Sequence, residues 1–338
     1  MSKKFICNLS LVLVIISSFM FVGCTSNTGS TSNSTTDKDE NKSVFNTVKE
    51  IDDEIIKGAS QNDQRNPSSS KDDLAVKPSE VYENISNDSS NNPSNEDPAP
   101  IASKIDTTNL SNEKIAWWFK PNKQHVTPEV NLNLKFDLNK YDAHYVGDTS
   151  KKVLYLTFDE GYENGYTPKI LDILKANDVK AIFFVTSPYV KDNPDIIKRM
   201  VEEGHIVGNH TNHHPSMPDV TRSEEKFNNE FSDVESKFKE ITGENMPLYF
   251  RPPMGEYSEK SLAMTKNLGY KTLFWSFAYH DWDINKQPDP VRAKDTIMNG
   301  LHNGAILLVH AVSKTNTEIL DSILKEAKAQ GYEFQLFQ

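Results

Sequence analysis

The chain has 338 residues and a formal net charge of −11, and 36% of its residues are hydrophobic. This charge argues against nucleic acid as a partner, because contacts with nucleic-acid phosphates require a basic face. Cys7 and Cys24 are its only cysteines, and the exported chain expected below therefore has no cysteine pair and must be held by packing.

Residues 1–23 have the pattern of a bacterial export signal. Lys3 and Lys4 precede a mostly apolar stretch over 5–21, and small residues stand directly before Cys24. The pattern resembles a lipoprotein signal, so we expect cleavage before Cys24, lipidation of Cys24 and anchoring on the outer side of the cytoplasmic membrane. An uncleaved anchor and an ordinary secretory peptide are the alternatives, and both also place the chain outside the cytoplasm.

Residues 24–114 are expected to form a disordered tether. They are dominated by Ser, Asn, Thr, Asp, Lys and Pro, a composition that cannot bury enough apolar surface to fold. One exception is 44–57, where apolar residues at helical spacing predict a short amphipathic helix. A soft linker of this length spans roughly 50 Å, which would let an anchored domain reach nearby cell wall.

Residues 115–338 are predicted to form one α/β domain, because strand-like and helical stretches alternate along them. Strands are expected near Val153, Ile182, Ile206, Tyr249, Leu273, Ile306 and Phe334, and helices over 194–203, 223–241, 258–268 and 316–330.

Acidic residues and histidines follow two of these strands. The run Val153–Phe158 ends at Asp159 and Glu160, and the strand near Ile206 is followed by His210 and His214. The carboxyl ends of strands in α/β folds are where catalytic groups collect. A spacing of four residues points two imidazoles the same way on one helical turn, within reach of one divalent ion. Each pair alone also fits solvated surface or coincidence, but two strand ends carrying such pairs favour an open metal site.

Later strands each lead into another polar group. Arg251 follows the strand near Tyr249, and its fork of donors is suited to holding Asp159 in one rotamer. Trp282 is a candidate for stacking on a sugar ring, although tryptophan also fills cores. His310 ends the run 305–309, where the alternatives are a catalytic and a buried structural histidine.

Together these segments resemble the motifs of the polysaccharide deacetylase family, whose members are metal-dependent enzymes with a distorted (β/α) barrel. The matching segments are 157–161, 210–214, 251–255, 278–282 and 308–310. The variant sequence over 159–167 resembles the branch that makes muramic δ-lactam in the spore cortex.

The resemblance implies a role for each matching residue. The expected metal is zinc, with manganese, cobalt or magnesium as alternatives. Asp159 would deprotonate the attacking water, His310 would protonate the leaving amine, and Arg251 completes the catalytic set. The expected metal ligands are Glu160, His210 and His214, and the expected substrate-binding residues are Pro253, Asp281 and Trp282.

Two positions depart from the family pattern. Glu160 replaces an aspartate and is one methylene longer, which puts direct ligation by its carboxylate in doubt. Ala278 occupies the position of an aspartate that orients the general-acid histidine in relatives, so another group must orient His310.

The function implied is de-N-acetylation of N-acetylmuramic acid in peptidoglycan on the route to muramic δ-lactam, with a wall amidase acting upstream. One alternative is deacetylation of N-acetylglucosamine or chitooligosaccharides. Another is a glycoside hydrolase, which requires two carboxyl groups about 5–9.5 Å apart and has no use for the histidines. A third is a catalytically inactive protein that binds wall glycan.

Overall fold

The computed structural model describes residues 104–131 and 133–338. The predicted export signal, Cys24 and the predicted helix over 44–57 lie outside the described residues. The elements, in chain order, are β1 (Ile115–Ala116), η1 (Leu138–Tyr141), β2 (Ala143–His144), β3 (Val153–Glu160), α2 (Thr167–Ala176), β4 (Ile182–Val185), α3 (Ser187–Asp192), α4 (Pro194–Glu202), β5 (Ile206–Asn209), α5 (Met217–Val220), α6 (Glu224–Thr242), β6 (Tyr249–Phe250), η2 (Pro253–Gly255), β7 (Glu256–Tyr257), α7 (Glu259–Asn267), β8 (Lys271–Leu273), α8 (Pro290–Gly300), β9 (Ala305–His310), α9 (Lys314–Ala329) and β10 (Glu333–Phe334).

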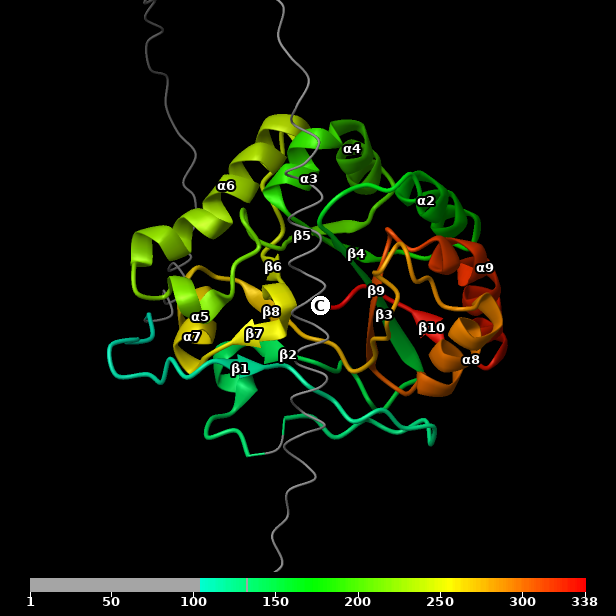
Figure 1. The fold of residues 1–338 in the computed structure, drawn as a ribbon, viewed down its shortest axis with the longest axis horizontal. Coiled ribbons are helices and arrows are strands. Elements are labelled where there is room, and N and C mark those ends of the chain that lie inside the picture. Colours follow the sequence, from blue (N-terminus) through cyan, green and yellow to red (C-terminus); the bar gives the residue numbers. More distant parts are fainter. Residues whose placement is uncertain (1–103, 132) are drawn as a thin grey trace, which may run out of the picture.

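Parallel strands form a curled sheet at the centre of the domain (Figure 1). Neighbouring strands follow the order β10, β3, β4, β5, β6, β8 and β2, and β9 also pairs with β3. The segment after β8 closes the curl, because the Leu308 amide donates to the Phe277 carbonyl at 2.8 Å. The predicted distorted (β/α) barrel is therefore confirmed.

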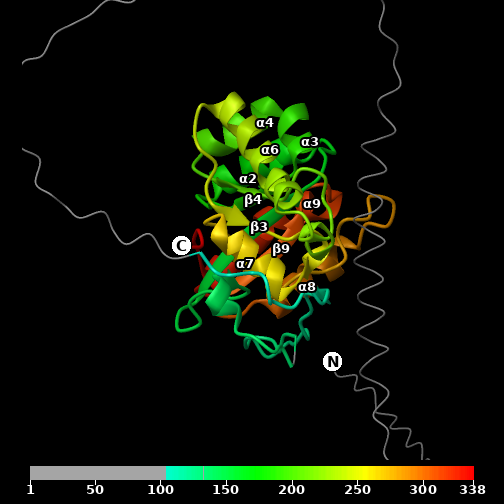
Figure 2. The same cartoon turned by 90° about the vertical axis from the view of Figure 1, so that its left-hand side faces the viewer.

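Helices cover the outside of this sheet, with α2, α3, α4 and α6 along one side and α8 and α9 along another (Figures 1 and 2). The side chains of β3 alternate between two apolar layers, as the pleat of a strand requires. Leu154 and Phe158 belong to the layer that includes side chains of these helices, whereas Val153 and Tyr155 belong to the layer inside the curl. The same alternation places Asp159 on the inner side.

The predicted helices agree with α4, α6, α7 and α9 to within a few residues at each end. The short strands β1, β2 and β7 have no clear sequence signal and were not predicted. Packing begins before the expected boundary at 115, since Ile105 and Asn267 exchange two hydrogen bonds of 2.8 Å. Over the part of the chain that the structure describes, no helix has the length and apolar character to span a membrane.

Candidate active site

Asp159 and Arg251 form a buried ion pair at the carboxyl end of β3. Arg251 Nη1 lies 2.7 Å from Asp159 Oδ1, and the arginine side chain is 0% exposed. Arg251 Nη1 also donates to the Thr157 hydroxyl at 2.8 Å, and its Nε donates to the Leu273 carbonyl at 3.0 Å. The predicted contact between Arg251 and Asp159 is confirmed, and the charge-assisted bond fixes the carboxylate in one orientation.

The two histidines meet at the same place. His210 Nε2 lies 3.2 Å from His214 Nε2 and 3.7 Å from Asp159 Oδ2. The two histidines were predicted to converge because they share one helical turn, and this reason is wrong, since residues 210–214 are not helical. The loop after β5 instead bends through Thr211 (φ 74°) and His214 (φ 55°), both in the left-handed region that residues other than glycine rarely adopt.

These two nitrogens fit a divalent ion. Two nitrogens at 2.0–2.1 Å from a tetrahedral ion lie roughly 3.3–3.4 Å apart, close to the separation observed. His210 Nδ1 lies 2.8 Å from the Arg251 carbonyl and must donate to it, so the lone pair of this neutral ring is on Nε2. Burial lowers the pKa of His210, and it lowers the pKa of His214 well below the ordinary value, which keeps both rings neutral as a metal requires.

Glu160 does not join the two histidines. It follows Asp159 within β3, so its side chain points to the opposite face, and it is 0% exposed. Burial raises its pKa well above the ordinary value, and the charges of Glu163 and Asp159 add to this effect. Among the described residues no group of three His, Cys, Asp or Glu side chains is placed to hold a metal. The predicted ligand set of Glu160, His210 and His214 is therefore corrected to the two histidines, with Asp159 as the adjacent carboxylate.

Glu160→Gln is expected to keep the metal affinity of the wild type, because the neutral amide replaces a carboxyl that does not face the ion. Since the folded-state pKa of Glu160 is raised, wild-type stability falls as pH rises above the unfolded-state value near 4.5. The variant lacks this loss, so its Tm should exceed that of the wild type at pH 8 by at least about 2 °C and match it at low pH. Metal content after dialysis and thermal unfolding at the two pH values measure both effects. Loss of the metal in Glu160→Gln would restore Glu160 as a ligand.

His310 lies beside Asp159 and is oriented by Asp281. Asp159 and His310 are register partners on β3 and β9, so their side chains point to the same side of the sheet. His310 Nδ1 lies 2.8 Å from Asp281 Oδ1, and the His310 amide donates to Asp281 Oδ2 at 2.8 Å. Because His310 Nδ1–H donates to the Asp281 carboxylate, Nε2 is the nitrogen that exchanges a proton with a substrate. Ala278 stands where relatives have the aspartate that orients this histidine, and in this chain Asp281 orients His310 instead.

Asp281 is itself held in place by Asn316. Asn316 Nδ2 donates to Asp281 Oδ2 at 2.6 Å, and the Tyr279 hydroxyl donates to Asn316 Oδ1. Asp281 is 1% exposed, and three donors occupy its carboxylate. The prediction that Asp281 binds substrate is therefore wrong, because its oxygens are used inside the protein. Sequence reasoning missed Asn316, whose position in the first turn of α9 resembles that of any capping residue.

The other predicted substrate-binding residues occupy different settings. Trp282 packs edge-on against His310, with ring centroids 5.9 Å apart, and it is only half-buried. Its position fits a contact with substrate next to the general acid, which stays a prediction. Pro253 is buried in η2, where the next residue, Met254, has a φ of 58°. No contact of Pro253 tests its predicted role.

The chain is similar to known proteins in sequence and in fold. A family model for polysaccharide deacetylases matches residues 146–273. The peptidoglycan-N-acetylmuramic acid deacetylase PdaA of Bacillus subtilis (strain 168) is 48% identical over 226 residues, which is 67% of this chain and 85% of that relative. The solved structure of B. subtilis PdaA, a family 4 carbohydrate esterase, matches with a TM-score of 0.65 and 47% identity over 67% of this chain and 96% of that chain. A family 4 pseudoenzyme from Bacillus anthracis matches with a TM-score of 0.52 and 31% identity over 57% of this chain and 66% of that chain.

Proposed function

Because the chain belongs to the polysaccharide deacetylase family, we propose that it removes the acetyl group from N-acetylmuramic acid residues of peptidoglycan. The identity with a relative named for that activity supports the choice of sugar. The observation that carries the proposal is the meeting of Asp159, His210 and His214 beside His310. Family deacetylases are metalloenzymes, and in this chain His210 and His214 would hold the ion.

Hydrolysis of an amide requires a polarised carbonyl, an anionic nucleophile near neutral pH and a protonated leaving nitrogen. A divalent ion, when bound, supplies polarisation of the carbonyl and a lowered pKa for water. Asp159, held by Arg251, accepts the proton of the attacking water. His310 carries a proton on Nε2 to the departing amine, and Asp281 stabilises the charged ring and fixes its orientation. The half-buried Trp282 packs edge-on against one side of His310.

The geometry also weighs on the alternatives. A glycoside hydrolase needs a second carboxyl facing Asp159, but Glu160 lies on the opposite face of β3 and Asp281 is occupied by His310 and Asn316. An inactive glycan-binding protein has no need of a positioned base and acid, and this chain holds both. Deacetylation of N-acetylglucosamine would use the same machinery and differs only in the sugar.

The biological setting is part of the proposal. We infer a substrate already stripped of peptide by an upstream amidase, because a free lactyl carboxylate is what the released amine must join to close muramic δ-lactam. The export signal and Cys24 support an extracytoplasmic enzyme anchored to the cell membrane as a lipoprotein, facing wall or spore cortex.

Acetate release from peptide-free glycan strands tests the proposal directly. The wild-type chain is expected to release acetate, and a chelator is expected to lower the rate by at least about a hundredfold, with recovery on adding back zinc. His210→Ala should lose both the metal and the activity. Mass spectrometry of the products identifies the deacetylated sugar and any ring closure. Acetate release at full rate under chelation would contradict the metal, and release only from chitooligosaccharides would contradict the choice of sugar.

A further inference from the structure

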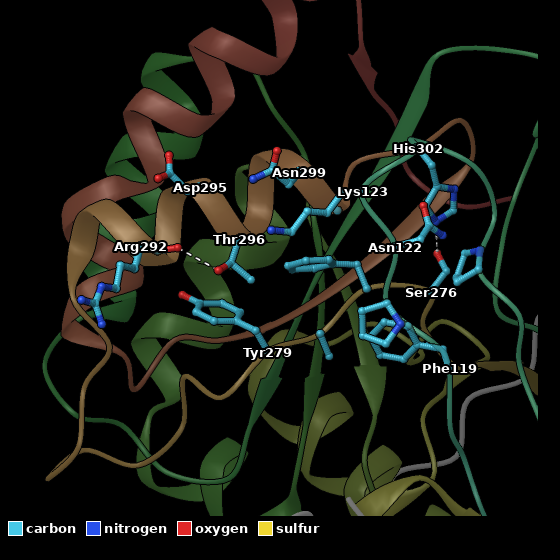
Figure 3. Close-up of a pocket in the computed structure, with 15 residues that line it drawn as sticks. Phe119, Asn122, Lys123, Ser276, Tyr279, Arg292, Asp295, Thr296, Asn299 and His302 are labelled. Atoms are coloured by element: carbon cyan, nitrogen blue, oxygen red, sulfur yellow. Dashed lines mark hydrogen bonds between the residues drawn. The ribbon is translucent and has the colours of Figure 1, made fainter. Parts of the chain in front are cut away.

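A cavity lies away from the residues of the candidate active site. Its volume is about 630 Å³, within the range of about 300–1,000 Å³ that is usual for small-molecule sites. It is enclosed by the N-terminal segment 119–128, the segment 276–279 that closes the barrel, and α8 (Figure 3). Neither Asp159 nor His310 lines it.

Two polar side chains that line the cavity, His302 and Ser276, are hydrogen-bonded within the protein. His302 Nε2 lies 2.9 Å from the Ser276 hydroxyl, and His302 Nδ1 lies 3.0 Å from the Asn303 carbonyl. Since a carbonyl only accepts, the proton is on Nδ1 and Ser276 donates to Nε2, while the Ile306 amide donates to the Ser276 hydroxyl. Burial lowers the pKa of His302, so the ring is neutral. This pair thus needs no ligand, and recognition must come from the walls.

The walls offer rings and amides. Phe119, Phe277 and Tyr279 line the cavity with aromatic rings, and Asn122 and Asn299 line it with amide side chains. Asn122 Nδ2 donates to the Val126 carbonyl and Asn122 Oδ1 accepts from the Gln124 amide, so recognition by an amide rests on Asn299. Flat apolar rings next to hydrogen-bonding amides suit a sugar, whose faces carry C–H groups and whose edges carry hydroxyls. In Figure 3, Lys123 extends across the cavity toward Thr296 of α8, and the Tyr279 ring lies on the other side of Thr296.

The rim carries positive charge on an acidic protein. Lys123 and Arg292 line the cavity, and neither takes part in an ion pair among the described residues. Asp295 is the carboxylate of the lining, which leaves one net positive charge. On a chain with a net charge of −11, two unpaired cations at one cavity favour an anionic ligand.

We propose that this cavity binds a carboxylate-bearing sugar residue of the same glycan strand, namely a muramic residue whose lactyl group is free of peptide. The proposal rests on the proposed function for the identity of the strand. Tyr279 connects the two sites, because its ring lines the cavity while its hydroxyl reaches Asn316, the residue that holds Asp281. A strand bound here is held next to the segment that carries Asp281 to His310.

A charge-reversed full-length chain, Lys123→Glu with Arg292→Glu, tests the site. Its affinity for peptide-free glycan of four or more sugars, measured by calorimetry with a chelator present to prevent turnover, is expected to fall about tenfold. Lys198→Glu is the matched control, because Lys198 is an exposed lysine on α4 with no ion pair among the described residues, and its affinity should equal that of the wild type. Chitooligosaccharides of equal length, which lack the carboxylate, should bind the wild type and the double variant equally.

Unchanged affinity in the double variant would overturn the site, and equal weakening for chitooligosaccharides would overturn the carboxylate as the recognised group. Acetate release by the wild type is measured separately. A wild-type chain that binds the glycan through Lys123 and Arg292 but releases no acetate would contradict the proposed function and leave the cavity assignment standing.

Discussion

Asp159→Asn is expected to lower kcat for deacetylation by about 10²–10⁴-fold, the usual effect of losing a positioned general base. Asparagine keeps an oxygen that can accept from Arg251, but it cannot take a proton from water. The two imidazoles remain in place, so the variant should bind metal as the wild type does. Acetate release under saturating glycan, together with metal content, measures both effects.

His210→Ala provides the contrast, because it removes a ligand and should lose metal and turnover together. The Asp159 change also leaves the buried Arg251 without its countercharge, which lowers the free energy of unfolding by up to about 3–5 kcal/mol. Kinetics must therefore be measured at a temperature where denaturation curves show the variant folded. A folded, metal-loaded variant with kcat within tenfold of the wild type would remove Asp159 from the role of base.

Asp281→Asn is expected to lower kcat by about 10²–10⁴-fold through His310 rather than through the metal. Asp281 accepts from the His310 amide, from His310 Nδ1 and from Asn316, and an asparagine turns its NH₂ group toward one of these donors. The charged imidazolium also loses a stabilising carboxylate, so the pKa of His310 should fall. Since the protonated ring is the active form, the decline of kcat at high pH should begin at a lower pH than in the wild type.

Asp283→Asn is the matched control for this change. Asp283 lies two residues further along the same loop and pairs with Lys286 at 3.7 Å. Its pH profile should equal that of the wild type. An Asp281→Asn profile that keeps its position on the pH axis, with only a uniform loss of rate, would reduce Asp281 to a structural role.

Much of this arrangement could be predicted from sequence, because strand periodicity and the order of polar residues are local signals. The strand that carries Asp159, the arginine that pairs with it and the histidine that ends β9 all lie where the pattern indicated. Family motifs predicted which residues meet. The motifs could not show which way the Glu160 side chain points. Because β3 continues through Glu160, its side chain points to the face opposite that of Asp159.

The partners of His310 were beyond sequence reasoning for a different reason. Asp281 was predicted to bind substrate, since an aspartate beside a tryptophan after a strand fits that role from sequence. Its true setting depends on Asn316 of α9, which donates to it, and on Tyr279 of the segment that closes the barrel, which donates to Asn316. Contacts between segments 35 residues apart or more leave no periodic trace in a single sequence. The left-handed Thr211 and His214 are likewise set by the fold rather than by residue type.

The guanidinium of Arg251 ties β3 to the segment at β8, because it bonds Thr157 and Asp159 on one side and the carbonyls of Leu273 and Phe274 on the other. The group that positions the base is therefore also a brace across the inside of the barrel. A homologue that lost activity through a substitution of Asp159 alone would also lose stability, because Arg251 would keep no ion-pair partner at this position. We therefore expect inactive homologues to carry substitutions at positions 159 and 251 together, or to have lost activity through His310, His210 or His214.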